Sequence, residues 1–221
     1  TDDFEMTNTL VEGNESNYQT VYISISNDVE HIKIINNTVA NNKTENSSTA
    51  FQINMTASSD SVLFMNNIVS QNYQYNSNED QYDLMSNSVG FSNGKVVMLN
   101  NYINPNISGS DRIKRSSGNF FNTTSPFVNA VGGNYNLGIF SGAVGNGIAS
   151  AHYDGNTVLA PTKDLNDVDR PNPSRSSPDM GALESSYAKK LNIINVSTAG
   201  SDSNTGTEES PLLTIQRALD I

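Results

Sequence analysis

The stretch IKIINNTVANN at residues 32–42 decides the fold, because its pattern occurs three more times along the chain. The gap-free matches are FEMTNTLVEGN (4–14), VLFMNNIVSQN (62–72) and VVMLNNYINPN (96–106). Each segment has apolar residues at its first and third positions, Asn at the fifth, an aliphatic residue three places later and Asn three further on. The anchors Asn8, Asn36, Asn66 and Asn100 are 28, 30 and 34 residues apart, a period typical of solenoid proteins.

The segments between these repeats predict short strands and loops. Residues 21–26 and 51–56 alternate apolar and polar side chains, which is the period of a β-strand. Residues 41–49 and 72–81 are polar and rich in turn formers, and we expect loops there. Helical spacing of apolar residues is absent from the first 150 positions. Several strands in each coil of about 30 residues predict an all-β chain that forms a parallel β-helix.

Stacking of the coils would place equivalent residues in columns. We predict one core column from Phe4, Ile32, Val62 and Val96, a second from Met6, Ile34, Phe64 and Met98, and a third from Val11, Val39, Val69 and Ile103. The anchors Asn8, Asn36, Asn66 and Asn100 would form a structural ladder at the bend after each strand. There Asn tolerates a left-handed backbone, and stacked amides can hydrogen-bond along the column.

Composition excludes several classes of function. The 221 residues carry a formal charge of -11, so a nucleic-acid partner is not expected. The chain has no Cys, which excludes disulfides, thiol catalysis and Cys-bound zinc. No apolar run is long enough for a membrane span. Hydrophobic residues make up 35% of the chain, but they are patterned, so disorder is not predicted.

After residue 106 the coils become irregular, and a series of short motifs follows. These are PFV (126–128), YNL (135–137), SGAVGNG (141–147), DLNDVDRP (164–171) and DMGALE (179–184). The series resembles the closing section of prokaryotic right-handed β-helix surface proteins of the pectin-lyase-like superfamily, the choice-of-anchor Q type. Gly142 stands where that family usually has Pro, and Asp167 where Gly is frequent. The resemblance implies a right-handed β-helix and a location at the prokaryotic cell surface or outside the cell.

A second resemblance concerns residues 191–220, which look like the opening strand, turn and short helix of such a β-helix. We therefore expect two units: residues 1–186 as the last coils and closing cap of one β-helix, and residues 187–221 as the start of a following β-helix domain. The order of an end before a beginning predicts a piece of a larger protein with tandem β-helices.

Two readings remain open for the carboxylates near residue 170. Asp164, Asp167 and Asp169 could bind calcium through their oxygen atoms, although no EF-hand spacing is present. The resemblance favours the other reading, an ion-paired cap of Arg170, Asp179 and Glu184 that closes the last coil. No other cofactor is predicted.

Catalytic groups are sparse in the sequence. The two histidines, His31 and His152, belong to no triad or metal motif, and we interpret both as structural or incidental. β-Helix polysaccharide lyases typically use a Lys or Arg as base, and the basic cluster at 111–115 is better explained as solvated charge.

The sequence thus favours a non-catalytic extracellular segment that acts as a stalk, adhesin or filament subunit. Its expected partners are neighbouring β-helix domains, copies of itself or a polysaccharide. The alternative is a polysaccharide lyase or glycosidase of the same fold, which outward carboxylates and a Lys or Arg facing one groove would favour.

Overall fold

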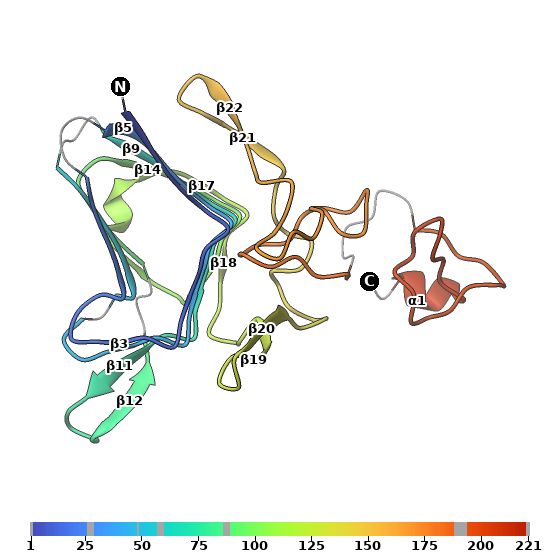
Figure 1. Ribbon diagram of the computed structural model, residues 1–221, viewed down its shortest axis with the longest axis horizontal. Helices are drawn as coiled ribbons and strands as arrows, with labels where there is room; N and C mark the ends of the chain where they lie inside the picture. The colour runs from blue at the N-terminus through green and yellow to red at the C-terminus, as the bar shows by residue number, and fades with distance from the viewer. Residues whose placement is uncertain are drawn as a thin grey trace.

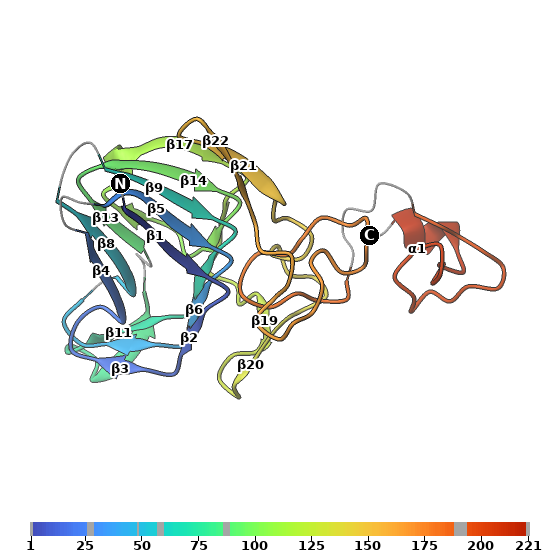
Figure 2. The same cartoon turned by 45° about the horizontal axis from the view of Figure 1, so that its top comes forward.

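A computed structural model shows that the chain is a parallel β-helix (Figure 1). It describes residues 2–25, 29–47, 49–56, 60–85, 89–187 and 194–219. Viewed as in Figure 1, the strands of successive coils overlie one another, and in Figure 2 the strands of one sheet lie side by side. The backbone pairs between coils, so each coil supplies hydrogen-bond partners for the next.

Four sheets form the faces of the helix. Sheet A contains, in spatial order, β1 (Asp2–Thr7), β5 (Val29–Ile35), β9 (Ser61–Met65), β14 (Lys95–Leu99) and β17 (Ile113–Ser117). Sheet B contains β2 (Leu10–Glu12), β6 (Thr38–Ala40), β10 (Ile68–Ser70), β15 (Tyr102–Ile103) and β18 (Phe120–Phe121). Sheet C contains β3 (Glu15–Ser16), β7 (Lys43–Thr44), β11 (Tyr73–Asn76) and β12 (Gln81–Leu84). Sheet D contains β4 (Val21–Ile25), β8 (Phe51–Met55), β13 (Val89–Ser92) and β16 (Ile107–Ser108).

The remaining elements are short. They are the 3-10 helix η1 (Ser110–Arg112), the hairpin strands β19 (Phe127–Asn129) and β20 (Asn134–Leu137), the hairpin strands β21 (Ser150–Tyr153) and β22 (Asn156–Leu159), and the helix α1 (Ile215–Leu219). No helix among the described residues is long and apolar enough to cross a membrane.

The strand registers confirm the three predicted core columns. Phe4 pairs with Ile32, Ile32 with Val62 and Val62 with Val96, and the columns that begin at Met6 and Val11 are paired in the same way. The members in the second and third coils are fully buried, and Phe64 packs edge-on against Phe51 and Phe91. Alternation along each strand therefore turns one set of side chains into a continuous apolar core.

The predicted left-handed bends are present, but the continuous asparagine ladder lies one residue further on. Asn8, Asn36, Asn66 and Asn100 have φ values between 47° and 56°. Of their amides, Asn66 bonds along the column to Asn36, at 3.2 Å. The full ladder is Asn37, Asn67, Asn101 and Asn119, in which each side-chain oxygen accepts from the backbone N–H and the amide of the preceding member. A second ladder joins Asn14, Asn42 and Asn72.

One predicted loop contains strands. Residues 72–81 were expected to be irregular, yet β11 pairs in parallel with β7 and turns back to pair antiparallel with β12. Tyr73 and Tyr75 supply the period-two alternation. β12 lies where the next coil would add a strand to sheet C, so the fourth coil passes from β15 to β16 without one. This explains why Asn67 and Asn101 are 34 residues apart, whereas Asn101 and Asn119 are separated by 18. The predicted loop at 41–49 likewise contains β7.

The C-terminal residues form a small unit around α1. Val196 and Leu212 make an isolated parallel bridge, and the Asp202 carboxylate accepts hydrogen bonds from Leu213 and Thr214. Asp202 thus ties the turn that contains it to the residues that precede α1. Residues 188–193 and 220–221, which belong to the predicted second domain of 187–221, lie outside the described residues. A second β-helix domain is not confirmed and stays a prediction.

Candidate functional site

The closing segment, residues 141–187, lies along the flank of the β-helix. The four predicted ladder residues hold it there: Asn8 donates to the Lys163 carbonyl, Asn36 to those of Asp179 and Gly181, Asn66 to that of Ile148 and Asn100 to that of Asn146, at 2.8–3.2 Å. A residue in the left-handed conformation projects its side chain out of the bend. There its amide can donate a hydrogen bond to backbone carbonyl groups that pair with no strand. The segment thus crosses the corners of the first four coils, and the role of its ion-paired trio as a cap that closes the last coil stays a prediction.

Close approach at Gly181 fixes the docking. Its N–H donates to the Asn66 carbonyl at 2.7 Å, and a Cβ on this residue would come within 2.6 Å of Ile68 and 2.7 Å of Thr38. Its φ of 90° also disfavours any other residue. The Gly in the motif at 179–184 thus permits contact between the closing segment and the coils.

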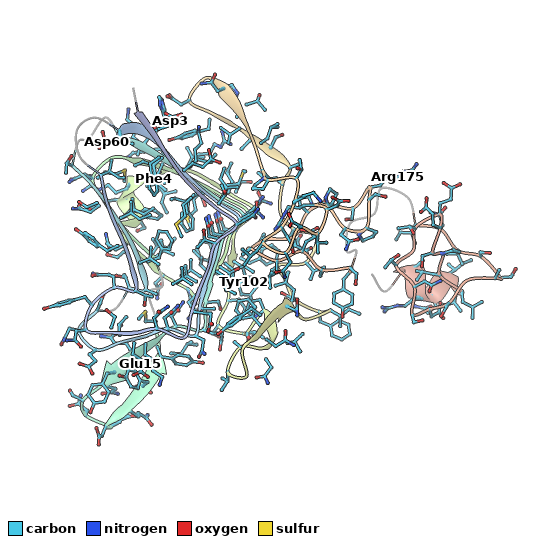
Figure 3. The ribbon with its side chains drawn as sticks, viewed as in Figure 1. Asp3, Phe4, Glu15, Asp60, Tyr102 and Arg175 are labelled. Atoms are coloured by element: carbon cyan, nitrogen blue, oxygen red, sulfur yellow. The ribbon has the colours of Figure 1, made fainter. Side chains whose placement is uncertain are left out.

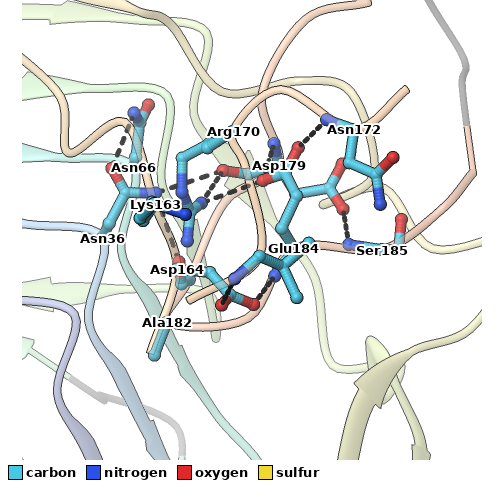
Figure 4. Close-up of polar contacts among 12 residues, drawn as sticks. Asn36, Asn66, Lys163, Asp164, Arg170, Asn172, Asp179, Ala182, Glu184 and Ser185 are labelled. Carbon is cyan, nitrogen blue, oxygen red and sulfur yellow. Dashed lines mark hydrogen bonds and ion pairs between the residues drawn. The ribbon is translucent and has the colours of Figure 1, made fainter. Parts of the chain in front are cut away.

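The predicted trio Arg170, Asp179 and Glu184 does come together inside the closing segment (Figure 4). Arg170 and Glu184 form an ion pair at 3.1 Å, with 1% and 0% of their side chains exposed. Glu184 also accepts from the backbone N–H groups of Asn172 and Asp179, both at 3.0 Å. The Asp179 carboxylate accepts from the N–H of Gly145 at 2.6 Å and that of Ser185 at 2.7 Å. These carboxylates accept hydrogen bonds from backbone N–H groups that are not paired in any sheet.

Burial dominates the electrostatics of this trio. It raises the pKa of Asp179 to about 6 and that of Glu184 to about 8, and it lowers the pKa of Arg170. The guanidinium pairs with Glu184 and donates to the backbone carbonyl of Asp179, and the Asp179 carboxyl raises the pKa of Glu184. The arrangement is that of a structural network, with its polar atoms turned inward.

The three predicted calcium ligands are used differently. The Asp164 carboxylate accepts from the N–H groups of Asn166, Val168 and Glu184 at 2.7–2.9 Å, and Asp169 pairs with Lys163 at 3.1 Å. Asp167 occupies a left-handed turn with φ of 64°. Within the described ranges, no group of three or more His, Cys, Asp or Glu side chains is arranged to hold a metal ion. Calcium binding at Asp164, Asp167 and Asp169 stays a prediction.

A groove of about 390 Å3 lies elsewhere, between the outer face of sheet A and the β21–β22 hairpin. Asp3 and His31 occupy neighbouring positions on β1 and β5, and His31 Nδ1 is 3.2 Å from Asp3 Oδ1. His31 Nε2 contacts Asp154 at the tip of the hairpin, and Lys33 pairs with Asp3 at 3.1 Å. Figure 3 shows Asp3 on the side of sheet A that faces the hairpin. The groove thus joins the first two coils to residues more than 120 positions later.

The hairpin wall of the groove is anchored on sheet A. Tyr153 is 4% exposed and donates to the Ser61 hydroxyl at 2.8 Å, and burial raises its pKa to about 12. Arg115 donates to the His152 carbonyl at 3.0 Å. Ala151 and Tyr153 pack in one apolar cluster with Leu63 and neighbouring sheet A residues. Packing therefore gives the groove a fixed wall.

The accessible part of the groove is acidic. The Asp3 and Asp154 side chains are 49% and 56% exposed, whereas those of His31 and Lys33 are 25% and 21% exposed. Lys33 lowers the pKa of Asp3 through a hydrogen bond. The Lys33 ammonium and the His31 ring thus lie deeper on the sheet, and an incoming molecule meets the carboxylates first.

No site was predicted at the groove residues from the sequence, and His31 was interpreted as structural or incidental. The repeat alignment, extended by one position, places Asp3 beside His31 and Glu5 beside Lys33, so half of the site was accessible from the sequence. The approach of Asp154 depends on how the irregular segment folds back, and no periodic signal marks it.

Comparison with known proteins finds no matching family model, no matching curated protein and no matching solved structure. The resemblance to choice-of-anchor Q proteins therefore stays a prediction, while the β-helix itself follows from the strand pairing.

Proposed function

We propose that the chain is a non-catalytic, extracellular β-helix segment of a prokaryotic cell-surface protein, in which it serves as a stalk, adhesin or filament subunit. Its partner is a further parallel β-helix coil, supplied by a neighbouring domain or by a second copy of the chain. Carbohydrate is a second partner, for which the groove is available.

The open face of the first coil carries this proposal. Among the described residues, β1, β2, β3 and β4 each pair on one side and lie at the same end of their four sheets. Phe4, Met6, Val11, Val21 and Ile23 pack on the core from this coil but stay half-buried, whereas their second-coil counterparts are 0–1% exposed. Unpaired edges with apolar side chains favour strand addition, and a coil of the same four-sided outline matches all four edges at once.

Light scattering over a range of concentrations tests this proposal. We expect the mass of the 221-residue chain to rise with concentration, and Met6→Lys to prevent the increase because it places a charge at the open face. Tyr22→Lys is the matched control, because Tyr22 is 55% exposed on the same coil and points away from the core. A wild-type chain that stays monomeric at all concentrations would count against self-stacking.

The groove favours a second candidate, a polysaccharide lyase or glycosidase. Carboxylates and a lysine line one cavity there, and glycosidases use a pair of carboxylates for acid and base catalysis. Incubation with acidic and neutral polysaccharides, with and without calcium, tests it by the release of new reducing or unsaturated ends. Non-catalytic function predicts no release, and release that Asp154→Asn abolishes would establish the enzyme.

A further inference from the structure

The depth at which charged side chains lie in the groove indicates the class of ligand that it binds. Its deeper basic side chains are already engaged: Lys33 with Asp3, and His31 with both Asp3 and Asp154. Glu5, on β1 beside Asp3, is exposed and also lines the groove. A ligand therefore meets three carboxylates before it meets Lys33 or His31. Such a lining attracts donors and cations, and it repels the carboxylates of acidic glycans.

The opposite wall of the groove has a different character. Asn156 and Thr157 on β22 bring an amide and a hydroxyl, while Leu159, which is 67% exposed, brings apolar surface; Val158 packs against the apolar cluster under the hairpin. Apolar side chains can contact the C–H groups of a sugar ring, and the amide and hydroxyl can bond its hydroxyls. The volume of about 390 Å3 falls within the range of small-molecule sites.

We infer that the groove binds a glycan through a protonated amine, so that its ligand class is the amino sugars. The ammonium lies among the outer oxygens of Asp3, Glu5 and Asp154, and the sugar ring rests against the exposed Leu159. Charge-assisted hydrogen bonds to the carboxylates give the selectivity for the free amine. This inference rests on the proposed surface role and names the carbohydrate for it.

Three oligosaccharide probes of the same length separate the contributions of charge and sugar. Calorimetric titration at mildly acidic pH would compare a glucosamine tetramer, an N-acetylglucosamine tetramer and a galacturonate tetramer. We expect the glucosamine tetramer to bind at least about tenfold more tightly than its acetylated counterpart, because acetylation removes the ammonium charge. The galacturonate tetramer should bind more weakly than either. Equal affinity for the two glucosamine probes, or tighter binding of galacturonate, would overturn the inference.

Single substitutions locate the site. Glu5→Gln should weaken glucosamine binding about fivefold or more, because it removes an exposed groove charge that does not anchor the hairpin. Glu209→Gln makes the same change in charge at an exposed position outside the groove and should leave affinity unchanged. Equal losses in both variants would show a non-specific charge effect and overturn the site. Tri-lysine that binds as tightly as the tetramer would overturn the assignment to a sugar.

Light scattering on the same samples separates this inference from the proposed function. Self-association without glucosamine binding would leave the proposed role standing and reject the groove. Glucosamine binding by a strict monomer would reject self-stacking and retain the groove.

Discussion

The coils and the closing segment satisfy the hydrogen bonds of their buried backbone in different ways. In the coils, each strand bonds to the equivalent strand of the next coil, and the Asn37–Asn67–Asn101 ladder repeats the same bonds at the bend between sheets A and B. In the closing segment, backbone N–H groups donate to single buried carboxylates, those of Asp164, Asp179 and Glu184. Repetition satisfies polar groups in one region and individual side chains satisfy them in the other.

This difference predicts how far the loss of one side chain destabilises each region. A ladder member has bonds above and below, so its loss affects neighbouring coils. A buried carboxylate serves a local loop, and its loss should affect the closing segment alone. The two regions meet at Asn8, Asn36, Asn66 and Asn100, so the segment can loosen while the coils persist.

Removal of one ladder amide should have the largest effect. Asn67 is fully buried, accepts from the N–H and amide of Asn37, and donates to the Ile34 carbonyl and to Asn101. Asn67→Ala leaves several buried groups unpaired and should lower the free energy of unfolding by about 3 kcal/mol or more. Denaturant unfolding measures it, with the exposed Asn136→Ala as a control expected to change little. A similar change in the free energy of unfolding for both variants would contradict the role of the ladder in stabilising the coils.

Loss of the buried arginine comes next in size and should be confined to the closing segment. Arg170→Met leaves Glu184 and Asp179 without their cation and should destabilise the segment by about 3 kcal/mol. Hydrogen exchange should show faster exchange of the Gly145 and Asp179 amides and unchanged exchange of the Asn67 amide. Equal acceleration at all three amides would mean that segment and coils unfold as one unit. Glu184→Gln in the same chain should restore part of the protection.

A smaller effect is expected from pH, again in the closing segment. Burial holds the pKa of Asp179 at about 6 and that of Glu184 at about 8, above their unfolded values, so the folded segment retains protons that the unfolded chain releases. Its stability should be highest at acidic pH and fall as the pH rises through about 6 and then about 8. Calorimetry at several pH values tests this, and Glu184→Gln should remove the upper part of the change. A segment that becomes more stable across this window would refute the stated direction.

The smallest effect is predicted for a surface pair between coils. Lys43 and Glu15 pair at 2.7 Å on the outer face of sheet C, with 40% and 66% of their side chains exposed. Solvent screens such a pair, so Lys43→Ala should leave the thermal unfolding midpoint within experimental error. A shift as large as that of Asn67→Ala would show that surface charges, rather than the inner ladder, hold the coils together.

The sequence allowed the periodic part of the fold to be predicted and little of the rest. Phe4, Ile32, Val62 and Val96 repeat because each must fill the same column, and that requirement is visible as a period. The ladder was placed at Asn66 instead of Asn67, because both residues of an Asn-Asn pair fit a bend and only the backbone decides which one turns inward. The trio of Arg170, Asp179 and Glu184 was identified, but its place on the flank depends on tertiary contacts without periodicity.

Disulfide trapping of the coil register tests the central claim, that coils stack with equivalent residues of the repeat side by side. The chain has no native Cys, and Tyr22 lies beside Gln52 on the outer face of sheet D. Tyr22→Cys with Gln52→Cys should oxidise readily within one chain, because neighbouring parallel strands bring the Cα atoms within disulfide range. Tyr22→Cys with Asn54→Cys, displaced by two residues on the same face, should oxidise far more slowly. Faster oxidation of the displaced pair would contradict the register and with it the stacking of the coils.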